Sequence, residues 1–515
     1  MNWQNYPLIR LVIPFILGMA VAHLYASRMD LMVLFIFCCT LLSLLFFLMK
    51  KTEEEYLSAK FSIVAATLSF AVGMSLYVHK YQSIAQGVPQ DSMVCNGVLS
   101  ELPQEKAHSW ALNLQQENGT HILLYIGKDK RGETNNTARL DRLDVGDTVF
   151  ANIKHLDATG DGKDSTFAPY HKYLFSQGIC ATCYATNSQW NVHPRKTTAS
   201  LSHSAKMFQH KLHNIYNERG INGESGDVIE AMTIGMKSKL DKNTRQKYAA
   251  AGTSHMLAMS GLHVGLIAMV LQFFFVTSAM PYGWMWLCNI CIIVILWCFA
   301  IVTGMSPSIV RATLMFTILM LCQSVSHELL PLNSCALAIA IMLCINPLYI
   351  NDAGFQLSFV SVGSIGLAGT LASSDYPPQP RILRFLKGIV YISFICAIAT
   401  APLVAYHFGR IPLLSVMSNI VITPFVYIIM WGSILWWVFL WFMPVNTLLT
   451  SVLNMAADTM NSIAERISSV PYASVEWHPS AFATVLCYIQ LLIIIYIIKR
   501  TKKIRLTNDT RRPLG

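Results

Sequence analysis

Charged residues are scarce in this sequence. Only 13% of its 515 residues are Asp, Glu, Lys or Arg, whereas 54% are hydrophobic and the mean hydropathy is +0.45. An average soluble protein has about 25% charged residues. The composition therefore excludes an ordinary soluble enzyme and favours a membrane protein.

The motifs of several enzyme classes are also missing. The sequence has no His-Glu-x-x-His or His-x-His-x-Asp pattern of metal-dependent hydrolases, and no Gly-x-x-x-x-Gly-Lys-Ser/Thr loop of ATPases. Ser260 is not in a nucleophile elbow, because Ala258 stands where that motif requires a glycine. We expect no catalytic residues, no metal and no cofactor, and a driving force that comes from elsewhere.

Twelve apolar runs, most of them near the ~20 residues needed to cross a bilayer, are spread along the chain. Three precede a polar segment and nine follow it, if the closely spaced pair 412–430 and 431–442 counts as two crossings. The runs are 8–25, 31–49, 61–78, 254–277, 283–302, 310–322, 334–350, 355–371, 388–407, 412–430, 431–442 and 482–498. We therefore expect a polytopic α-helical membrane protein with about twelve spans.

Basic residues flank these runs and indicate the topology. The net charge is +10, and much of it lies at Lys50-Lys51, at Arg381, Arg384 and Lys387, and in the tail 499–505. Loops rich in Lys and Arg stay in the cytoplasm. We expect both termini in the cytoplasm and the polar segment outside. The second full-length run also argues against a cleaved signal peptide.

The polar segment has the pattern of a small β-domain. Alternating runs at 93–102, 109–116, 120–127, 147–155 and 178–186 are separated by turn residues, which predicts five strands compatible with an OB-like barrel. Its ten Lys/Arg and twelve Asp/Glu residues between Asp91 and Arg195 give no basic field. The expected parts of the chain are N-terminal spans 1–85, extracytoplasmic OB-like domain 86–195, amphipathic and basic helical linker 196–250, transmembrane domain 251–500 and basic cytoplasmic tail 501–515.

Three cysteines lie in this β-domain. Cys95 falls on the first predicted strand, and Cys180 and Cys183 fall on the last. Outside the cytoplasm Cys95 could form a disulfide with Cys180 or with Cys183, and free thiols are the alternative. A zinc half-site is disfavoured, because structural zinc takes four ligands.

Two amphipathic helices are expected, one before the transmembrane domain and one within it, before the last span. The patterns at 201–216 and 445–469 are typical of helices lying at a membrane surface. A second helical stretch over 225–251 is rich in Lys and Arg near its end, where it could attract a polyanion.

If the spans cross the membrane alternately in this order, several polar residues lie at their outer ends. Charged and polar side chains are costly within a bilayer and usually line a water-filled path or pair with one another. We expect a common outer mouth made by His255, Ser306, Arg311, Asp352, Gln356, His407 and Arg410, with Ser260 and His263 one or two turns deeper.

Structural roles compete with this interpretation. Arg311 could snorkel to the interface or pair with Asp352, and Asp352 could cap the following helix. His255 and His263 are eight residues apart, about 12 Å along a continuous helix, which is too far to share one metal ion.

Four ordered stretches resemble the ComEC competence protein family. They are 250–265 (AAGTSHMLAMSGLHVG), 302–312 (VTGMSPSIVRA), 346–358 (NPLYINDAGFQLS) and 401–412 (APLVAYHFGRIP). Residues 167–179 (FAPYHKYLFSQGI) are similar to the end of that family's OB-like domain.

The resemblance implies a channel in the bacterial inner membrane that passes single-stranded DNA into the cytoplasm during competence. It implies other competence proteins as partners, namely a periplasmic DNA receptor and a cytoplasmic helicase or ATPase. Trp110, Tyr125, Phe150 and Tyr170 could stack on bases, with core packing as the alternative. Many members carry a metallo-β-lactamase-like domain at the C-terminus. No such ligand cluster follows Ile498, so we expect any nuclease either in a separate protein or in the OB-like domain, whose sequence shows no metal-binding pattern.

Two other functions remain open from the residues alone. One is a transporter of another solute that uses the same polar mouth. The other is a membrane-embedded hydrolase built on His255, Ser260 and His263, which the 12 Å separation along a continuous helix disfavours.

Overall fold

The computed structural model describes most of the chain. The described residues are 6–25, 54–87, 94–100, 103–128, 146–159, 168–193, 201–236, 240–275, 282–325, 331–371 and 380–509, except 107, 118 and 258, together with a few isolated residues outside these ranges. The predicted run 31–49 lies largely outside this part. Contacts divide the chain into two units, which we call the barrel unit (residues 2–213 and 264–355) and the hairpin unit (residues 214–263 and 356–515).

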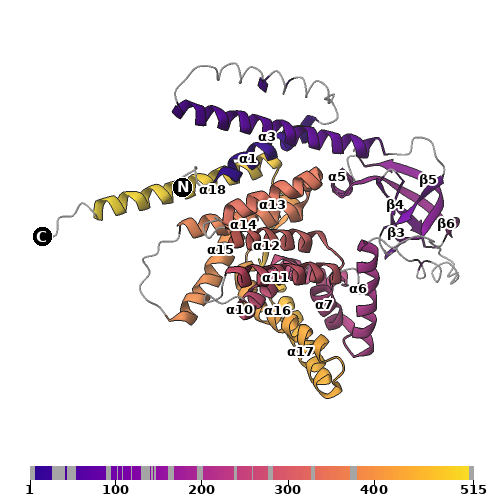
Figure 1. Cartoon of the computed structure of the whole chain (residues 1–515). Helices are drawn as coiled ribbons and strands as arrows, with labels where there is room; N and C mark the ends of the chain where they lie inside the picture. Colours follow the sequence, from indigo (N-terminus) through magenta and orange to yellow (C-terminus); the bar gives the residue numbers. More distant parts are fainter. Residues whose placement is uncertain are drawn as a thin grey trace. The chain divides into compact units, whose positions relative to one another are not determined.

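The small β-domain of the barrel unit is a closed sheet (Figure 1). Its strands are β1 (Val94–Leu99), β2 (Gln104–Glu105), β3 (Ser109–Gln115), β4 (His121–Gly127), β5 (Thr148–Ala158) and β6 (Ile179–His193), with α5 (Ala168–Ser176) before the last. The order is β1-β5-β6-β4-β3-β2, and β1 also pairs with β3, so that five strands form a small barrel. The β4–β6 pair is parallel and the others are antiparallel.

All five predicted strands are confirmed, and among the described residues of this domain only the two-residue β2 was not expected. The alternation that predicted them reflects burial of one face. Along β1 exposed and buried residues alternate, and Leu112, Leu114, Ile122 and Leu124 are fully buried in the barrel core.

Helices make up the rest of the barrel unit. They are α1 (Pro7–Tyr25), α3 (Glu54–Ala85), α6 (Leu201–Glu218), α10 (Gly261–Phe275), α11 (Tyr282–Val302), α12 (Pro307–Val325), α13 (Pro331–Ile345) and the 3₁₀ helix η3 (Pro347–Asn351); α6 ends, and α10 begins, in the hairpin unit. Helices α1 and α3 approach closely through glycines, since a Cβ on Gly18 would lie 2.1 Å from the carbonyl oxygen of Phe70.

The hairpin unit contains the linker helices and the end of the chain. Its helices are α7 (Gly223–Thr233), α8 (Lys242–Ala250), α9 (Ser254–Leu257), α14 (Ala353–Leu371, from Gln356 on), α15 (Arg381–Phe408), α16 (Ser415–Val438), α17 (Met443–Ser468) and α18 (Ala481–Asp509). Strands β7 (Arg410–Pro412) and β8 (Ser474–Glu476) form a separate two-stranded sheet.

Helices α16 and α17 form an antiparallel hairpin. At the connection, the indole N–H of Trp436 donates to the Thr450 hydroxyl (2.8 Å), and the Asn446 amide donates to the Trp436 carbonyl (3.2 Å). At the opposite end the β7–β8 sheet joins the residues just before α16 to those just after α17. The two helices are therefore fixed to each other at both ends.

The predictions of helix boundaries need several corrections. The pair 412–430 and 431–442 is one helix, α16, because Trp431 and Gly432 continue the helix without a turn residue that would end it. The expected helix over 225–251 is two helices, and 334–350 is a helix followed by η3. The run 254–277 is not continuous: it breaks between Leu257 and Gly261 into α9 and α10.

In the described part of the chain, four helices are long and apolar enough to cross a membrane. They contain residues 62–85, 283–302, 387–408 and 415–438, and six shorter apolar helices accompany them. The molecule is thus a mostly helical membrane protein with a small barrel.

Gly252 occupies a position that other residues fit poorly. It ends α8 with a φ of +76°, and Thr253 N–H donates to the Tyr248 carbonyl (2.8 Å), which completes a Schellman cap. A Cβ here would lie 2.7 Å from the Cβ atoms of both Pro412 and Ser415. The backbone of α8 and the start of α16 can approach this closely only with glycine.

We expect Gly252→Ala to lower the free energy of unfolding by about 2 kcal/mol or more, since it adds backbone strain to a steric clash. Thermal unfolding of the full chain in detergent measures the change. Gly283→Ala is the matched control, because no atom lies within 4 Å of its added Cβ. Equal stability of the two variants would show that the end of α8 and the start of α16 are less closely packed than in this structure.

Candidate functional site

Arg311 and Asp352 form a buried ion pair in the barrel unit. Arg311 lies on α12 with only 5% of its surface exposed, and its Nη1 is 3.3 Å from Oδ2 of Asp352, which follows η3. Gly354 leaves room for the guanidinium, because a Cβ there would lie 3.0 Å from Nη2. The pairing with Asp352, which was one alternative for Arg311, is present in the structure.

Asp352 serves two further partners. Its Oδ2 accepts the N–H of Phe355 (2.8 Å) at the start of α14, so the predicted helix cap is also present. Its Oδ1 accepts a long hydrogen bond of 3.5 Å from the amide of Gln177, the residue that follows α5. One carboxylate therefore connects α12, the start of α14 and the segment leading into β6.

The neighbouring Asn351 belongs to a polar cluster that sequence reasoning missed. Its amide donates to the hydroxyl of Tyr77 on α3 (2.9 Å), and that hydroxyl lies 2.7 Å from Nδ1 of His23 on α1. Tyr77 is fully buried. The signal was available, since His23 interrupts an apolar run where a polar side chain needs a partner.

Ser306 precedes α12 in the same unit. Its carbonyl accepts the N–H groups of Ile309 and Val310, whereas its buried hydroxyl has no hydrogen-bond partner among the described residues. Gly304 and Met305 before it have positive φ angles, which form the tight turn that leads into α12.

In the hairpin unit, Gln356 and His407 are hydrogen-bonded. The amide oxygen of Gln356 on α14 lies 2.9 Å from Nε2 of His407 near the end of α15. Gly409 then ends α15 with a φ of +68°. The backbone of Arg410 lies opposite that of Glu476 in the antiparallel β7–β8 sheet. Arg410 is half-buried in this strand.

Ser260 and His263 cap the start of α10. The Ser260 hydroxyl accepts the N–H of Leu262 (3.3 Å), and Nδ1 of His263 accepts the N–H of Ser260 (3.2 Å). This reciprocal arrangement is a capping box with histidine at its third position. The hydroxyl of Ser260 also lies 3.1 Å from the same Nδ1. A structural role therefore accounts for the pair, and His263 is 1% exposed.

His255 lies in α9, on the other side of the break, and is exposed. Because the helix is interrupted, the 12 Å separation along a continuous helix does not apply to His255 and His263. In the part of the chain that is described, no three His, Cys, Asp or Glu side chains lie close enough to hold a metal ion.

The four stretches singled out in the sequence contact one another in pairs. Gly252 from the first packs on Pro412 from the fourth, Arg311 from the second pairs with Asp352 from the third, and Gln356 from the third bonds His407 from the fourth. Each contact lies within one unit.

The barrel cysteines are buried thiols in this structure. A hydrogen bond joins the side chains of Cys95 and Cys183; it lowers the pKa of Cys95 and, with burial, raises that of Cys183. The thiol of Cys180 instead donates to the carbonyl of Gly87 (3.5 Å), and burial raises its pKa. Of the two disulfides considered, Cys95–Cys183 is the one whose thiol groups are hydrogen-bonded to each other.

Aromatic residues and lysines gather on the barrel. Tyr184, which is 45% exposed, stacks on Tyr125 with 5.2 Å between ring centres, and the Tyr125 hydroxyl lies 2.6 Å from that of Tyr170. The ammonium group of Lys106 lies 5.5 Å from the centre of the Tyr125 ring, and that of Lys128 lies 5.7 Å from the Trp110 ring. Trp110 and Tyr125 are buried, so Tyr170 and Tyr184 present the exposed aromatic surface.

These features define a mostly helical membrane protein that contains a small barrel and in which polar side chains on separate helices pair with one another. The family model described as "Competence protein" matches residues 232–501, and the chain belongs to this family. That range contains all the polar positions of the predicted mouth.

Two curated relatives are similar over part of the chain. ComE operon protein 3 of Bacillus subtilis (strain 168) is 25% identical over 257 residues, which is 50% of this chain and 31% of that protein. Recombination protein 2 of Haemophilus influenzae is 22% identical over 356 residues, 65% of this chain and 42% of that protein. The chain therefore spans less than half the length of either relative. No solved structure matches it.

We expect Asp352→Ala to destabilise the chain by about 3–5 kcal/mol, because it leaves the Arg311 guanidinium buried without a counter-charge. The double variant Arg311→Met/Asp352→Ala should recover part of this loss. Thermal unfolding of the full chain in detergent gives both values, and Glu476→Ala at an exposed position is the control. A single variant no less stable than the double variant would contradict a pairing role for Asp352.

Proposed function

We propose that this chain forms a channel that passes single-stranded transforming DNA across the bacterial inner membrane into the cytoplasm. The observation that carries the proposal is the match of residues 232–501 to the competence family. The buried polar pairs support it, because polar groups at membrane depth are retained where they border a path or hold its walls together.

In this proposal the polar residues have two roles. His255, Ser306 and Arg410 contribute to the mouth of the path. The pairs Ser260–His263, Arg311–Asp352 and Gln356–His407 fix the ends of the helices that border it. The partners are single-stranded DNA, the lipid bilayer and other competence proteins, among them a periplasmic DNA receptor and a cytoplasmic helicase or ATPase.

The proposed topology keeps twelve crossings and both termini in the cytoplasm. Helix α16 takes the place of the closely spaced pair of runs as one crossing, and α17, which returns along it, supplies the next. The chain thus still ends on the inner side, where its basic tail belongs.

We also propose that the barrel is an OB-like domain that binds single-stranded DNA outside the membrane. Its five closed strands agree with this fold. OB-like domains bind single strands by stacking bases on aromatic side chains next to basic groups. Tyr184 and Tyr170 are exposed aromatic residues of the barrel, and Lys106, which lies over the ring of Tyr125, is an exposed basic residue near them.

The deciding experiment is deletion of the gene in its naturally competent host. Fluorescent DNA should then enter the periplasm but not the cytoplasm, and the full chain supplied in trans should restore cytoplasmic entry. Microscopy of DNase-resistant label distinguishes the two compartments. Normal entry of DNA into the cytoplasm of the deletion strain would overturn the proposal of a DNA channel. Loss of uptake of another solute, with DNA uptake intact, would favour a transporter of that solute.

For the barrel, we expect Tyr184→Ala to weaken binding of a thymidine oligonucleotide by roughly 5- to 150-fold, the range that loss of one stacked base gives. Fluorescence anisotropy with the full chain in nanodiscs measures this. Tyr184→Phe keeps the ring and should bind as the parent does. Val94→Ala, another exposed β-domain position, is the matched control. Unchanged binding by Tyr184→Ala would remove this surface from the proposal.

A further inference from the structure

Helix α17 combines the length of a membrane span with a polar surface. It has 26 residues and runs antiparallel to the apolar α16, to which it is fixed at both ends. A helix of this length extends about 39 Å, enough to cross the ~30 Å hydrocarbon core. If α16 crosses the bilayer, α17 covers the same depth. A helix lying on the membrane surface, as the sequence predicts for 445–469, cannot satisfy both attachments.

One side of α17 packs against the linker helices through polar contacts. The Asn454 amide donates to the Gly220 carbonyl (3.1 Å), the Ser225 hydroxyl donates to Asp458, and the Tyr248 hydroxyl donates to Asn461 (2.7 Å). Farther along, Lys247 lies 3.1 Å from Glu465.

These linker contacts follow α16 from one end to the other. Tyr216 stacks on Trp436, with 4.8 Å between ring centres, and Gly252 packs on Pro412 just before the helix begins. The segment between Tyr216 and Gly252 thus covers the same depth as the hairpin. Polar segments occur at such a depth only where they are buried in protein or border water.

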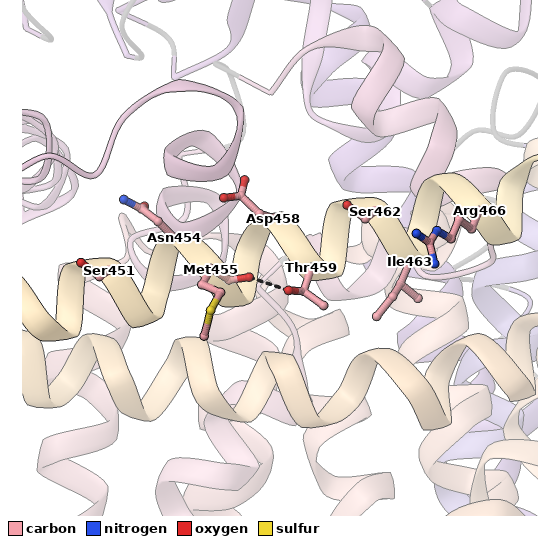
Figure 2. Close-up of a pocket in the computed structure, with 8 residues that line it drawn as sticks. All are labelled: Ser451, Asn454, Met455, Asp458, Thr459, Ser462, Ile463 and Arg466. Atoms are coloured by element: carbon pink, nitrogen blue, oxygen red, sulfur yellow. Dashed lines mark hydrogen bonds between the residues drawn. The ribbon is translucent and has the colours of Figure 1, made fainter.

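The polar face of α17 extends beyond these contacts and is open there, although two of its residues, Asn454 and Asp458, also bind the linker helices. It consists of the residues three and four apart along one face, drawn in Figure 2: Ser451, Asn454, Met455, Asp458, Thr459, Ser462, Ile463 and Arg466. We call this face the α17 stripe. It borders a cavity of about 610 Å³, and Asn454, Asp458 and Ser462 also border a neighbouring cavity of about 580 Å³ reaching the linker helices.

The exposed face of α16 has the opposite character. Its exposed side chains include Met417 (65%), Val421 (38%), Ile428 (43%) and Leu435 (46%). Apolar side chains of this kind suit lipid, whereas the hydroxyl, amide and charged groups of the α17 stripe would lose their hydration in it. The hairpin therefore has one face for lipid and another for water.

We propose that the α17 stripe is a wall of the aqueous path through the membrane, along which a hydrated polyanion passes. This inference rests on the proposed function and identifies the helix that borders the path. Four of the eight stripe residues carry a hydroxyl or amide group, Arg466 is the one cation among the eight, and Asp458 is hydrogen-bonded to Ser225. Such a wall offers hydrogen bonds to a phosphate backbone without a row of cations that would hold it in place.

The first test measures access of water and needs no DNA. Single cysteines replace Ser451 and Ser462 on the stripe, or Val421 and Ile428 on α16, in the full chain with its native cysteines replaced. A charged, membrane-impermeant methanethiosulfonate should modify the stripe positions at least tenfold faster than the α16 positions, because a thiol facing lipid neither ionises nor meets the reagent. Equal rates at all four positions, or reaction at neither stripe position, would overturn the proposal.

The second test uses the native background, so it does not depend on replacing cysteines. Ser462→Trp narrows the path and should lower cytoplasmic DNA uptake at least tenfold at normal protein levels, whereas Ile428→Trp should stay within twofold of the parent. Equal uptake by the two variants would overturn the role of the stripe. Failure of the unmodified chain to support uptake would instead overturn the proposed function, while leaving the labelling result unaffected.

Discussion

Burial of charged and hydrogen-bonding side chains among apolar helices is the constraint on which this structure depends, because each buried polar group loses its hydration. A buried guanidinium without a counter-charge costs several kcal/mol. Arg311 is paired with Oδ2 of Asp352. The same oxygen accepts the N–H of Phe355, and Oδ1 accepts the amide of Gln177. The hydroxyl of Tyr77 is paired with Asn351 and His23. Because these partners come from separate helices, satisfying each polar group also fixes the helices relative to one another.

The same constraint separates residues that hold the structure from residues available for function. Ser260 and His263 use their polar atoms on each other and on the start of α10, and Gln356 and His407 are bonded to each other. Most of the stripe on α17, by contrast, faces a cavity. Polar residues in an apolar stretch of sequence are therefore a good indication of where the helices meet. They are a weaker indication of what passes between them.

Local patterns predicted the elements well, and long-range pairing decided what they missed. Alternation of buried and exposed residues identified all five barrel strands, and apolar runs identified helices such as α11 and α15. Composition could not show that α16 continues through Trp431, nor that the helix at Ser254 breaks before Gly261. Asp352 had two predicted partners, and both are present, whereas Tyr77 was missed because its partners lie far away in the sequence. For α17 the polar face was visible in the sequence, whereas its attachment to α16 at both ends was not.

The attachment of α16 to α17 at both ends has a mechanical consequence. The β7–β8 sheet closes one end of the hairpin, and the bonds around Trp436 close the other, so the two helices cannot separate without breaking several hydrogen bonds together. A pair of this kind moves as one rigid body. If the chain is the proposed channel, opening and closing of the path would then come from movement of other elements, with the hairpin as the fixed frame.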